Sequence, residues 1–305
     1  MKAVERRDAF GQARGRGVPV VKTAVTVMAE LLCAAALTGG CTPTLATMEP
    51  ARIVPEGHWQ VSGATTAGMP VGDPLSAIEE IASLEGVEGA SAMTPEQIRT
   101  LAKGSSIIFI HPPGVSAYLS AAYGVSRHFE IGMRGSADTA RGWIRWQFLR
   151  VRPGIYGALG LGYATYFQGF PVEDYTDLAR PVSFSRQEMD LPVQLGLSGK
   201  LGHIWFGPKL VAANFEVEES VCAITKNGVC LGWGSTRVTG MATYFGGQLG
   251  GAIGYERLWV AAELSFMSLN VRADLDVDVA ETKELIDYRT KGWALSPSLG
   301  IIAWF

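Results

Sequence analysis

The sequence has little charge and few cysteines for its length. Only 18% of its 305 residues are charged, and its 26 Lys and Arg do not outnumber its 29 Asp and Glu. No basic excess is left to neutralise phosphates, which excludes a nucleic-acid binder. Its four cysteines are too few for a fold built on disulfides.

Motifs that carry chemistry are also missing. There are only four histidines, and no Gly-x-Ser-x-Gly, His-Glu-x-x-His or Cys-x-x-Cys sequence occurs. Runs of glycine such as Gly157-x-x-Gly160-x-Gly162 do not open an amphipathic helix after a buried strand, so they do not indicate a nucleotide loop. We therefore expect no cofactor and no bound metal.

Glycine and apolar residues are abundant instead. The chain contains 37 glycines, roughly 12% against an average near 7%. Hydrophobic residues make up 48% of it. This composition excludes a disordered chain, because so much apolar surface would bury itself.

The first forty residues look like an export signal. A basic stretch over residues 1–22 precedes an apolar run from Thr23 to Leu37, which ends in Gly39-Gly40-Cys41. These features predict a signal peptide over 1–40, and the apolar run is shorter than the roughly 20 residues that a spanning helix needs. The small residues before Cys41 resemble the lipobox of bacterial lipoproteins, which implies lipidation of Cys41. Ordinary export with a cut nearby is the alternative.

The rest of the sequence alternates with a period of two. From Val115 to Val125, every second residue is apolar, and the residues between are mostly Ser, Ala, Tyr and Gly. This period indicates strands, because successive side chains point to opposite faces. About ten segments fit it: 58–65, 115–125, 129–135, 142–151, 155–167, 188–198, 203–215, 238–255, 258–271 and 293–305.

The connections between these segments alternate in length. Tight turns at 126–128, 152–154, 199–202 and 256–257 interleave with polar loops at 66–112, 168–187, 220–237 and 272–292 and a short loop near 137–140. Short turns at one end and long loops at the other are typical of outer-membrane barrels. We therefore predict an all-β fold, a transmembrane antiparallel β-barrel of about ten strands, with eight to twelve possible. An even number places both termini on the short-turn side.

The composition of the second face separates a membrane barrel from a soluble one. A soluble lipocalin-like barrel would expose many Lys and Glu to water. Here the second face is mostly Gly, Ala and Ser, as in Ile155–Phe167, and small residues suit the crowded lumen of a narrow barrel. A continuous apolar face suits lipid, which favours the membrane barrel.

The C-terminus carries a resemblance to a known class. Leu299, Ile301, Ala303 and Phe305 alternate up to a terminal aromatic, with Trp304 beside it. This resembles the last strand of Gram-negative outer-membrane barrel proteins, over about residues 57–305. The resemblance implies that Phe305 is an assembly signal read by the barrel-assembly machinery, that the partner is outer-membrane lipid, and that both termini are periplasmic. We expect a periplasmic linker at 41–56 and the barrel at 57–305.

Loop 66–112 has a helical pattern. Asp73-Pro74 precedes apolar residues at helical spacing, and Thr94-Pro95-Glu96-Gln97 has the form of a capping box. Two short helices in an extracellular loop could form a lid over the barrel mouth or pack on its rim. If the strand at 58–65 is miscounted, the segment is periplasmic.

Polar side chains on the inner face should fill the lumen. A charge facing lipid near the midplane costs on the order of 2–4 kcal/mol, so we expect an inward polar network that closes the lumen by pairing. Its members are Glu130, Arg134, Arg145, Gln147, Glu188, Asp190, Gln194, Lys209 and Glu263. In loop 220–237, Cys222 and Cys230 flank the turn Lys226-Asn227-Gly228, which predicts a disulfide in an oxidising compartment.

Three alternatives accompany a non-catalytic role in envelope structure or surface interaction. One is a channel for a small solute. Another is an outer-membrane hydrolase, in which His111 would act with acids of the extracellular side (Glu173, Asp174, Asp177, Asp190, Asp274, Asp276 and Asp278). The third is a soluble lipocalin-like lipoprotein. The sequence does not identify an extracellular ligand.

Overall fold

A computed structural model describes most of the chain after the signal region. It covers residues 45–85, 91–92, 94, 96–97, 100, 104, 107–108, 110–151, 154–166, 179–226, 229–255, 257–279 and 282–305. The segment 1–40 and Cys41 lie outside these residues, as do Glu173, Asp174 and Asp177.

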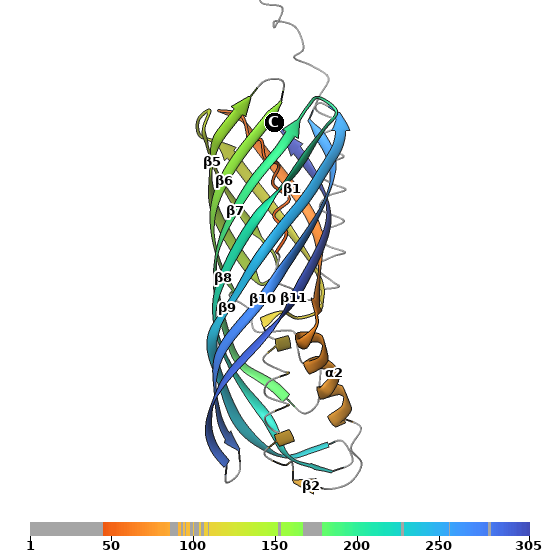
Figure 1. Ribbon diagram of the computed structural model, residues 1–305, viewed down its shortest axis with the longest axis vertical. Helices are drawn as coiled ribbons and strands as arrows, with labels where there is room; N and C mark the ends of the chain where they lie inside the picture. Colours follow the sequence, from red (N-terminus) through yellow and green to blue (C-terminus); the bar gives the residue numbers. More distant parts are fainter. Residues whose placement is uncertain are drawn as a thin grey trace, which may run out of the picture.

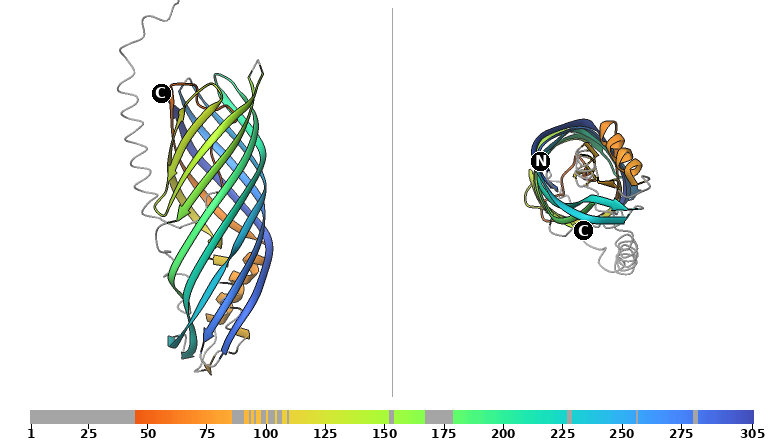
Figure 2. Two further views of the ribbon diagram at one scale, coloured as in Figure 1. Left: turned by 90° about the vertical axis from the view of Figure 1, so that its left-hand side faces the viewer. Right: turned by 90° about the horizontal axis from the view of Figure 1, so that it is seen from below.

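Ten antiparallel strands close into a single ring (Figures 1 and 2). Each strand pairs with its neighbour in sequence, and β1 pairs with β11 to close the ring. The strands are β1 (Trp59–Val71), β3 (Gly114–Gly124), β4 (Phe129–Gly135), β5 (Thr139–Val151), β6 (Ile155–Tyr166), β7 (Ala179–Ser198), β8 (Gly202–Lys226), β9 (Val229–Tyr255), β10 (Leu258–Val279) and β11 (Thr282–Trp304). The predicted all-β barrel of about ten strands is confirmed.

Two small elements lie outside the ring. Helix α2 (Asp73–Glu85) follows β1, and the two-residue β2 (Ser91–Ala92) pairs with β8. The predicted helix at Asp73-Pro74 is present, but Gly72 rather than Asp73 caps it, because the Gly72 carbonyl accepts from the amides of Leu75 and Ser76. Thr94 and Gln97 exchange the two hydrogen bonds of a capping box, as their spacing predicts.

Helix α2 lies at the end of the barrel that is opposite the short turns and the C-terminus (Figure 1). It packs against β11 and β1. A side chain at Gly292 would collide with the ring of Pro74, so glycine at this position of β11 lets the helix approach the wall. We predicted that the helical segment lies on the long-loop side, and α2 does lie there. The alternative, in which the strand at 58–65 is miscounted and the segment lies on the short-turn side, is wrong for α2.

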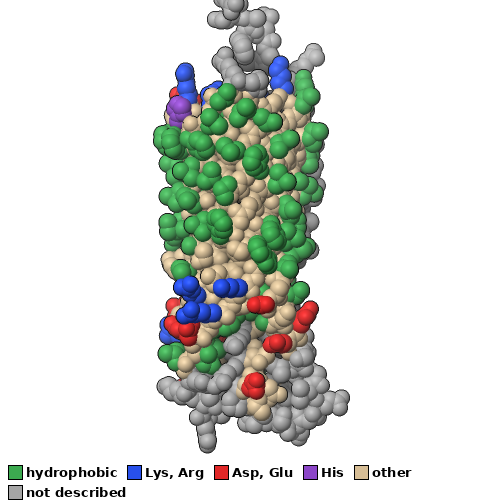
Figure 3. Space-filling view, in the orientation of Figure 1, with side chains coloured by type: hydrophobic (Ala, Val, Ile, Leu, Met, Phe, Trp, Pro, Cys, Tyr) green, Lys and Arg blue, Asp and Glu red, His purple; other side chains and the backbone are tan. Residues whose placement is uncertain are grey.

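The outer face of the barrel is apolar over most of its height. Large exposed hydrophobic side chains occur on every strand of the ring, for example Trp59, Leu119, Ile131, Trp146, Leu161, Leu195, Phe206, Phe245, Val260 and Leu299. Figure 3 shows one face of the barrel, on which hydrophobic side chains form a green belt. A soluble barrel would not expose so much apolar surface, so the lipocalin-like alternative is wrong and the belt is a lipid-facing surface. Separately, no helix in the described part of the chain is long and apolar enough to cross a membrane.

Four strands continue beyond this belt as two long hairpins. Strands β8 and β9 stay paired to Lys226↔Val229, and β10 and β11 stay paired to Val279↔Thr282. The predicted loops 220–237 and 272–292 are therefore wrong, as is the start of the first loop, because β1 extends to Val71. We call residues 216–226, 229–240, 272–279 and 282–291 the projecting hairpins, and the rest of the ring the spanning barrel.

The projecting hairpins have the opposite polarity to the spanning barrel. Their outer face carries exposed charges, including Arg237, Arg272 and Asp274. Figure 3 shows blue and red side chains below the belt on the face that it draws. Their inner face is mostly apolar and packs on residues before β3 and on α2. The buried side chains there include Ile107, Ile108, Ile110, Val217, Val221, Val238, Val271, Leu275 and Tyr288. The loops were mispredicted because the outward positions change from apolar to charged residues here, and this change in the sequence was taken as the end of a membrane strand.

The side chains in the core of the projecting hairpins are shielded from solvent. Burial raises the pKa of Tyr288 well above the usual range for a phenol. Cys222 is fully buried and is bonded to Cys230, with their Cα atoms 5.6 Å apart. This disulfide crosses the β8–β9 hairpin near its tip. The outer end is thus held by a hydrophobic core and a covalent cross-link.

Candidate functional site

A stretch of the chain before β1 runs through the inside of the spanning barrel. Residues 45–56, which we call the lumen segment, are red-orange inside the ring in Figure 1. Leu45, Ala46, Thr47, Met48, Glu49 and Val54 are each at most 3% exposed. The prediction of a periplasmic linker does not hold for these residues.

The lumen segment has no regular secondary structure, so other groups must satisfy its backbone. Pro50 and Pro55 hold the backbone extended and remove two N–H donors that would need partners. Apart from Glu56, which forms an isolated bridge with Gly124 of β3, the segment pairs with no strand of the described barrel. Inward-pointing side chains of the barrel wall supply the hydrogen bonds that a neighbouring strand would otherwise make.

Carboxylates and an amide oxygen accept hydrogen bonds from the segment's N–H groups. Glu263 accepts from the amides of Thr47 (2.7 Å) and Met48 (2.9 Å) and from the indole of Trp205 (2.9 Å). Glu130 accepts from the amide of Val54 at 2.7 Å. Gln147 accepts from the amide of Ile53 at 3.2 Å and donates to the carbonyl of Ala51 at 3.0 Å.

Cations and amides donate to the segment's carbonyls. Lys209 Nζ lies 2.7 Å from the carbonyl oxygen of Leu45, and Arg134 Nη1 lies 2.7 Å from that of Ala46. Gln194 donates to the carbonyl of Glu49 at 2.8 Å, and Arg145 donates to that of Pro50. Side chains of the barrel wall therefore bind both the N–H groups and the carbonyl groups of the lumen segment, from Leu45 to Val54.

The segment also completes the charge balance of the lumen. Arg141 holds Asp190 through two bonds of 2.8 and 2.7 Å and holds Glu49 at 2.8 Å. Arg145 pairs with Glu130 at 3.2 Å and lies 3.7 Å from Glu49. Among the described residues around the segment, four cations meet four carboxylates: Arg134, Arg141, Arg145 and Lys209 against Glu49, Glu130, Asp190 and Glu263. Without Glu49 the lumen would keep an unmatched buried cation.

Small residues make room for this packing. A side chain at Gly162 would collide with both Asp190 and Arg141. The glycine therefore lets a bidentate ion pair stand in a lumen that is also crossed by a peptide. This agrees with the prediction that small residues suit the crowded inner face.

All nine residues predicted for the lumen network are buried in the described barrel. Seven of them contact the lumen segment or each other as above, and Asp190 does so through Arg141. Glu188 lies further toward the projecting hairpins, where it pairs with Arg186 and accepts from Tyr166 at 3.2 Å.

Sequence reasoning missed three members of the network. Arg141 lies two residues before the inward position 143, and Arg186 lies two residues before the inward Glu188. Both lie just outside the predicted strands 142–151 and 188–198. Extending the period by one pair of residues would have found them. Glu49 has no such signal, because the lumen segment has no periodic pattern.

The structure does not bring together those residues of the hydrolase alternative that it describes, namely His111, Asp190, Asp274, Asp276 and Asp278. His111 is fully buried beside Tyr244, with ring centroids 5.8 Å apart. Asp274, Asp276 and Asp278 face outward on β10, and Asp190 is bound to Arg141. No group of three metal-binding side chains occurs among the residues that the structure describes.

Among the solved structures to which this chain is similar are outer membrane proteins. The chain resembles the outer membrane protein OprG from Pseudomonas aeruginosa (8% identity, 83% of this chain and 98% of that one, TM-score 0.34). It also resembles Neisserial surface protein A (9%, 81% and 99%, 0.25) and a major outer membrane protein from Thermus thermophilus (11%, 81% and 99%, 0.30). The closed antiparallel barrel of ten strands is shown by the strand pairings of the chain itself.

The likeness concerns the fold alone, and at these identities and TM-scores it carries no argument about function. No family model matches the sequence, and no curated protein matches it. Function has to be argued from the occupied lumen and the projecting hairpins themselves.

Proposed function

We propose that this protein is a non-conducting, non-catalytic outer-membrane barrel that serves an envelope-structural or surface-interaction role. The observation that carries the proposal is the lumen segment, which is buried along the axis of the spanning barrel and bonded to its wall from Leu45 to Val54. A solute path would have to displace this segment and break its ion pairs.

The proposal includes an orientation. The entry of β1 and the end of β11 lie together on the short-turn side, where the backbones of Trp59 and Phe305 exchange hydrogen bonds. We assign this side to the periplasm, where Phe305 would be available to the assembly machinery. The projecting hairpins then lie outside the cell, where their disulfide suits an oxidising environment.

The absence of catalysis is part of the same proposal. General acid–base chemistry needs a base beside the reacting group, and His111 lies inside the barrel while the β10 acids point away from it. The charged residues of the described lumen are engaged with the segment or with each other, which supports a structural role for them.

Lipidation of Cys41 remains a proposal, and the position of Leu45 constrains it. Lys209, which binds the Leu45 carbonyl, is seven residues into β8 from Gly202, which is about 18 Å along a barrel axis at a tilt of roughly 40°. The four residue steps from Cys41 to Leu45 span at most ~14 Å even when fully extended, which is less than this distance. An acyl anchor in the leaflet on the short-turn side would therefore require the lumen segment to leave the lumen. Lipidation of Cys41 and the closed lumen are thus alternatives, and the closed lumen is proposed for the form without an acyl anchor.

Conductance in planar bilayers tests the closed lumen. The wild-type barrel should give no stable open channels of porin size, and deletion of residues 45–54 should produce them. Met48→Asp, which places a carboxylate beside Glu263, is a second variant if the deletion does not fold. Gel mobility before and after boiling shows which variants are folded. Stable wild-type channels would contradict the proposal.

A further inference from the structure

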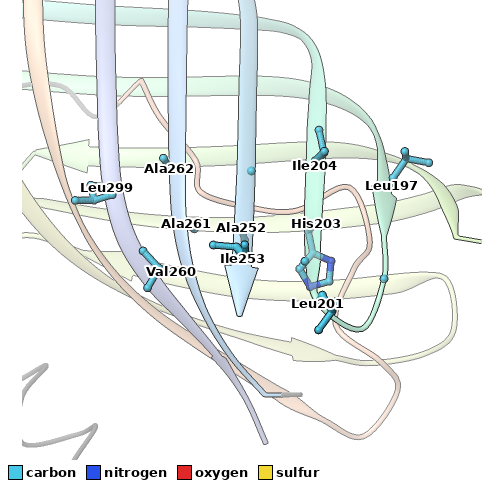
Figure 4. A pocket seen from close by; sticks show the side chains of 13 residues that line it. Leu197, Leu201, His203, Ile204, Ala252, Ile253, Val260, Ala261, Ala262 and Leu299 are labelled. Atoms are coloured by element: carbon cyan, nitrogen blue, oxygen red, sulfur yellow. The ribbon is translucent and has the colours of Figure 1, made fainter. Parts of the chain in front are cut away.

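Two cavities adjoin at the short-turn end of the barrel. The first, which we call the rim pocket, has a volume of about 550 Å³ and opens at the mouth between the β7–β8 turn, the β9–β10 turn and the exit of the lumen segment. The second, the outer groove, measures about 580 Å³ and is lined by apolar side chains (Figure 4). Gly199 and His203 border both cavities.

The rim pocket is cationic and aromatic. Arg52, Lys200 and Arg257 line it together with Trp259 and Trp304. The guanidinium of Arg52 lies 5.1 Å from the ring centre of Trp304, which fixes its position without neutralising it. Even with the terminal carboxylate of Phe305 counted, cations exceed anions in the lining.

Among the residues that the structure describes, the carboxylate of Glu56 on the same rim does not cancel this charge. Glu56 lies outside the lining of the pocket and pairs at 3.8 Å with Arg127 on the same rim. Both of these side chains are largely exposed to solvent. The pocket therefore attracts an anionic group.

His203 gives an independent sign of a ligand. Its side chain is buried between Trp259 and Trp304, with ring centroids 5.0 and 5.5 Å away. One ring nitrogen, Nδ1, is 2.7 Å from Ser198 Oγ, and the other, Nε2, is buried with no hydrogen-bond partner in the described part of the chain. A buried polar atom left without a partner costs free energy that a ligand atom can remove.

The outer groove lies on the lipid-facing side of the same turn. Leu197, Ile204, Ile253, Val260 and Leu299 form its walls, and Gly202, Gly251 and Ala262 leave space between them. All five wall residues are on the outer face of strands β7–β11 and are partly exposed. A hydrocarbon chain of the surrounding leaflet matches this shape and polarity.

We infer that the rim pocket binds a phosphate group, carried by an anionic phospholipid whose acyl chain lies in the outer groove. Lys and Arg are the side chains that bind phosphate through charge-assisted hydrogen bonds. A phospholipid carries a phosphate and hydrocarbon chains in one molecule. It can therefore place its phosphate in the rim pocket and an acyl chain in the outer groove, because the two cavities adjoin at Gly199 and His203. The inference is independent of whether the lumen conducts.

The test compares wild type with the double variant Lys200→Gln, Arg257→Gln. Native mass spectrometry would count the lipids retained from bilayers of phosphatidylcholine with a minority of phosphatidylglycerol. Wild type should retain phosphatidylglycerol in preference, and the double variant should bind it at least about tenfold more weakly, since both charged donors to the phosphate are lost. Arg127→Gln removes a charge from the same rim outside the pocket and should change nothing.

A second pair of measurements separates the lipid from a soluble phosphate. Ala262→Phe adds an outward apolar side chain that fills the groove, so it should weaken retention of phosphatidylglycerol and leave calorimetric binding of glycerol 3-phosphate unchanged. If glycerol 3-phosphate binds through Lys200 and Arg257 but phosphatidylglycerol is not preferred, the acyl-chain half of the inference is overturned. If the folded double variant retains phosphatidylglycerol as wild type does, the whole inference is overturned.

Discussion

The spanning barrel and the projecting hairpins are built from the same strands with their polarity exchanged. In β10, Phe266 faces lipid and Glu263 faces the lumen, whereas a few residues later Asp274 faces water and Leu275 faces a core. The period of two continues unbroken through this change. Each region thus places its apolar face according to what surrounds it, lipid or water.

The two regions are therefore held by different forces. Inside the spanning barrel, buried ion pairs and hydrogen bonds to the lumen segment stand beside two small apolar clusters, one around Met48 and Trp205 and one around Val54. Inside the projecting hairpins, aliphatic side chains pack as in a soluble protein, with a disulfide near the tip. Leu45 belongs to both, because its carbonyl binds Lys209 and its side chain joins the apolar core.

The largest expected effect is in the spanning barrel. Arg141→Ala removes the partner of Asp190 and of Glu49, leaving buried carboxylates unpaired, which costs about 3–5 kcal/mol of unfolding free energy. Urea unfolding followed by gel mobility measures it. Arg289→Ala, which removes an exposed ion pair with Asp287 on the projecting hairpins, should change little. If both substitutions lowered the unfolding free energy equally, the claim that buried ion pairs stabilise the spanning barrel more than exposed ones stabilise the projecting hairpins would be wrong.

A core substitution should act on the projecting hairpins alone. Leu275→Ala leaves a cavity in a packed apolar core, with an expected cost of about 3 kcal/mol. Hydrogen exchange should show faster opening of β10 and β11 beyond residue 272, with protection of the spanning barrel unchanged. Val260→Ala, on the lipid-facing side of β10, is the matched control and should leave the hairpins protected. Loss of protection in the spanning barrel after Leu275→Ala would show that the two regions unfold together.

The disulfide should have the smallest effect of the three. Cys222→Ser with Cys230→Ser opens a short loop that strand pairing already closes, so we expect a loss of at most about 2 kcal/mol, confined to the β8–β9 tip. Limited proteolysis of the folded protein should reveal a new cut near the tip and an intact barrel. A change in the urea midpoint of the spanning barrel would contradict this confinement.

The contrast between the regions also explains what the sequence could predict. The strands and the nine inward residues follow from a local period of two, which membrane and water both impose. The projecting hairpins were missed because outward charges such as Asp274 were taken as the end of β10, although Val271, Ala273 and Leu275 keep the period.

The lumen segment could not be predicted by the same reasoning. Its partners stand far away in the sequence, 76 residues for Val54 with Glu130 and 216 residues for Thr47 with Glu263. Nothing local in Leu45–Glu56 marks it as buried, since it has no alternation and contains two prolines and charged residues. Only the closed ring shows which carboxylates and cations surround it.

Thiol accessibility inside the folded barrel tests the position of the lumen segment most directly. Met48 is 1% exposed in the lumen, whereas Arg127 stands exposed on the rim. In a background with Cys41→Ser, the substitutions Met48→Cys and Arg127→Cys would be treated in turn with a water-soluble maleimide, before and after unfolding. The structure predicts that position 127 reacts in both states and that position 48 reacts only after unfolding. Equally fast labelling of both positions in the folded protein would show that the lumen segment does not occupy the barrel.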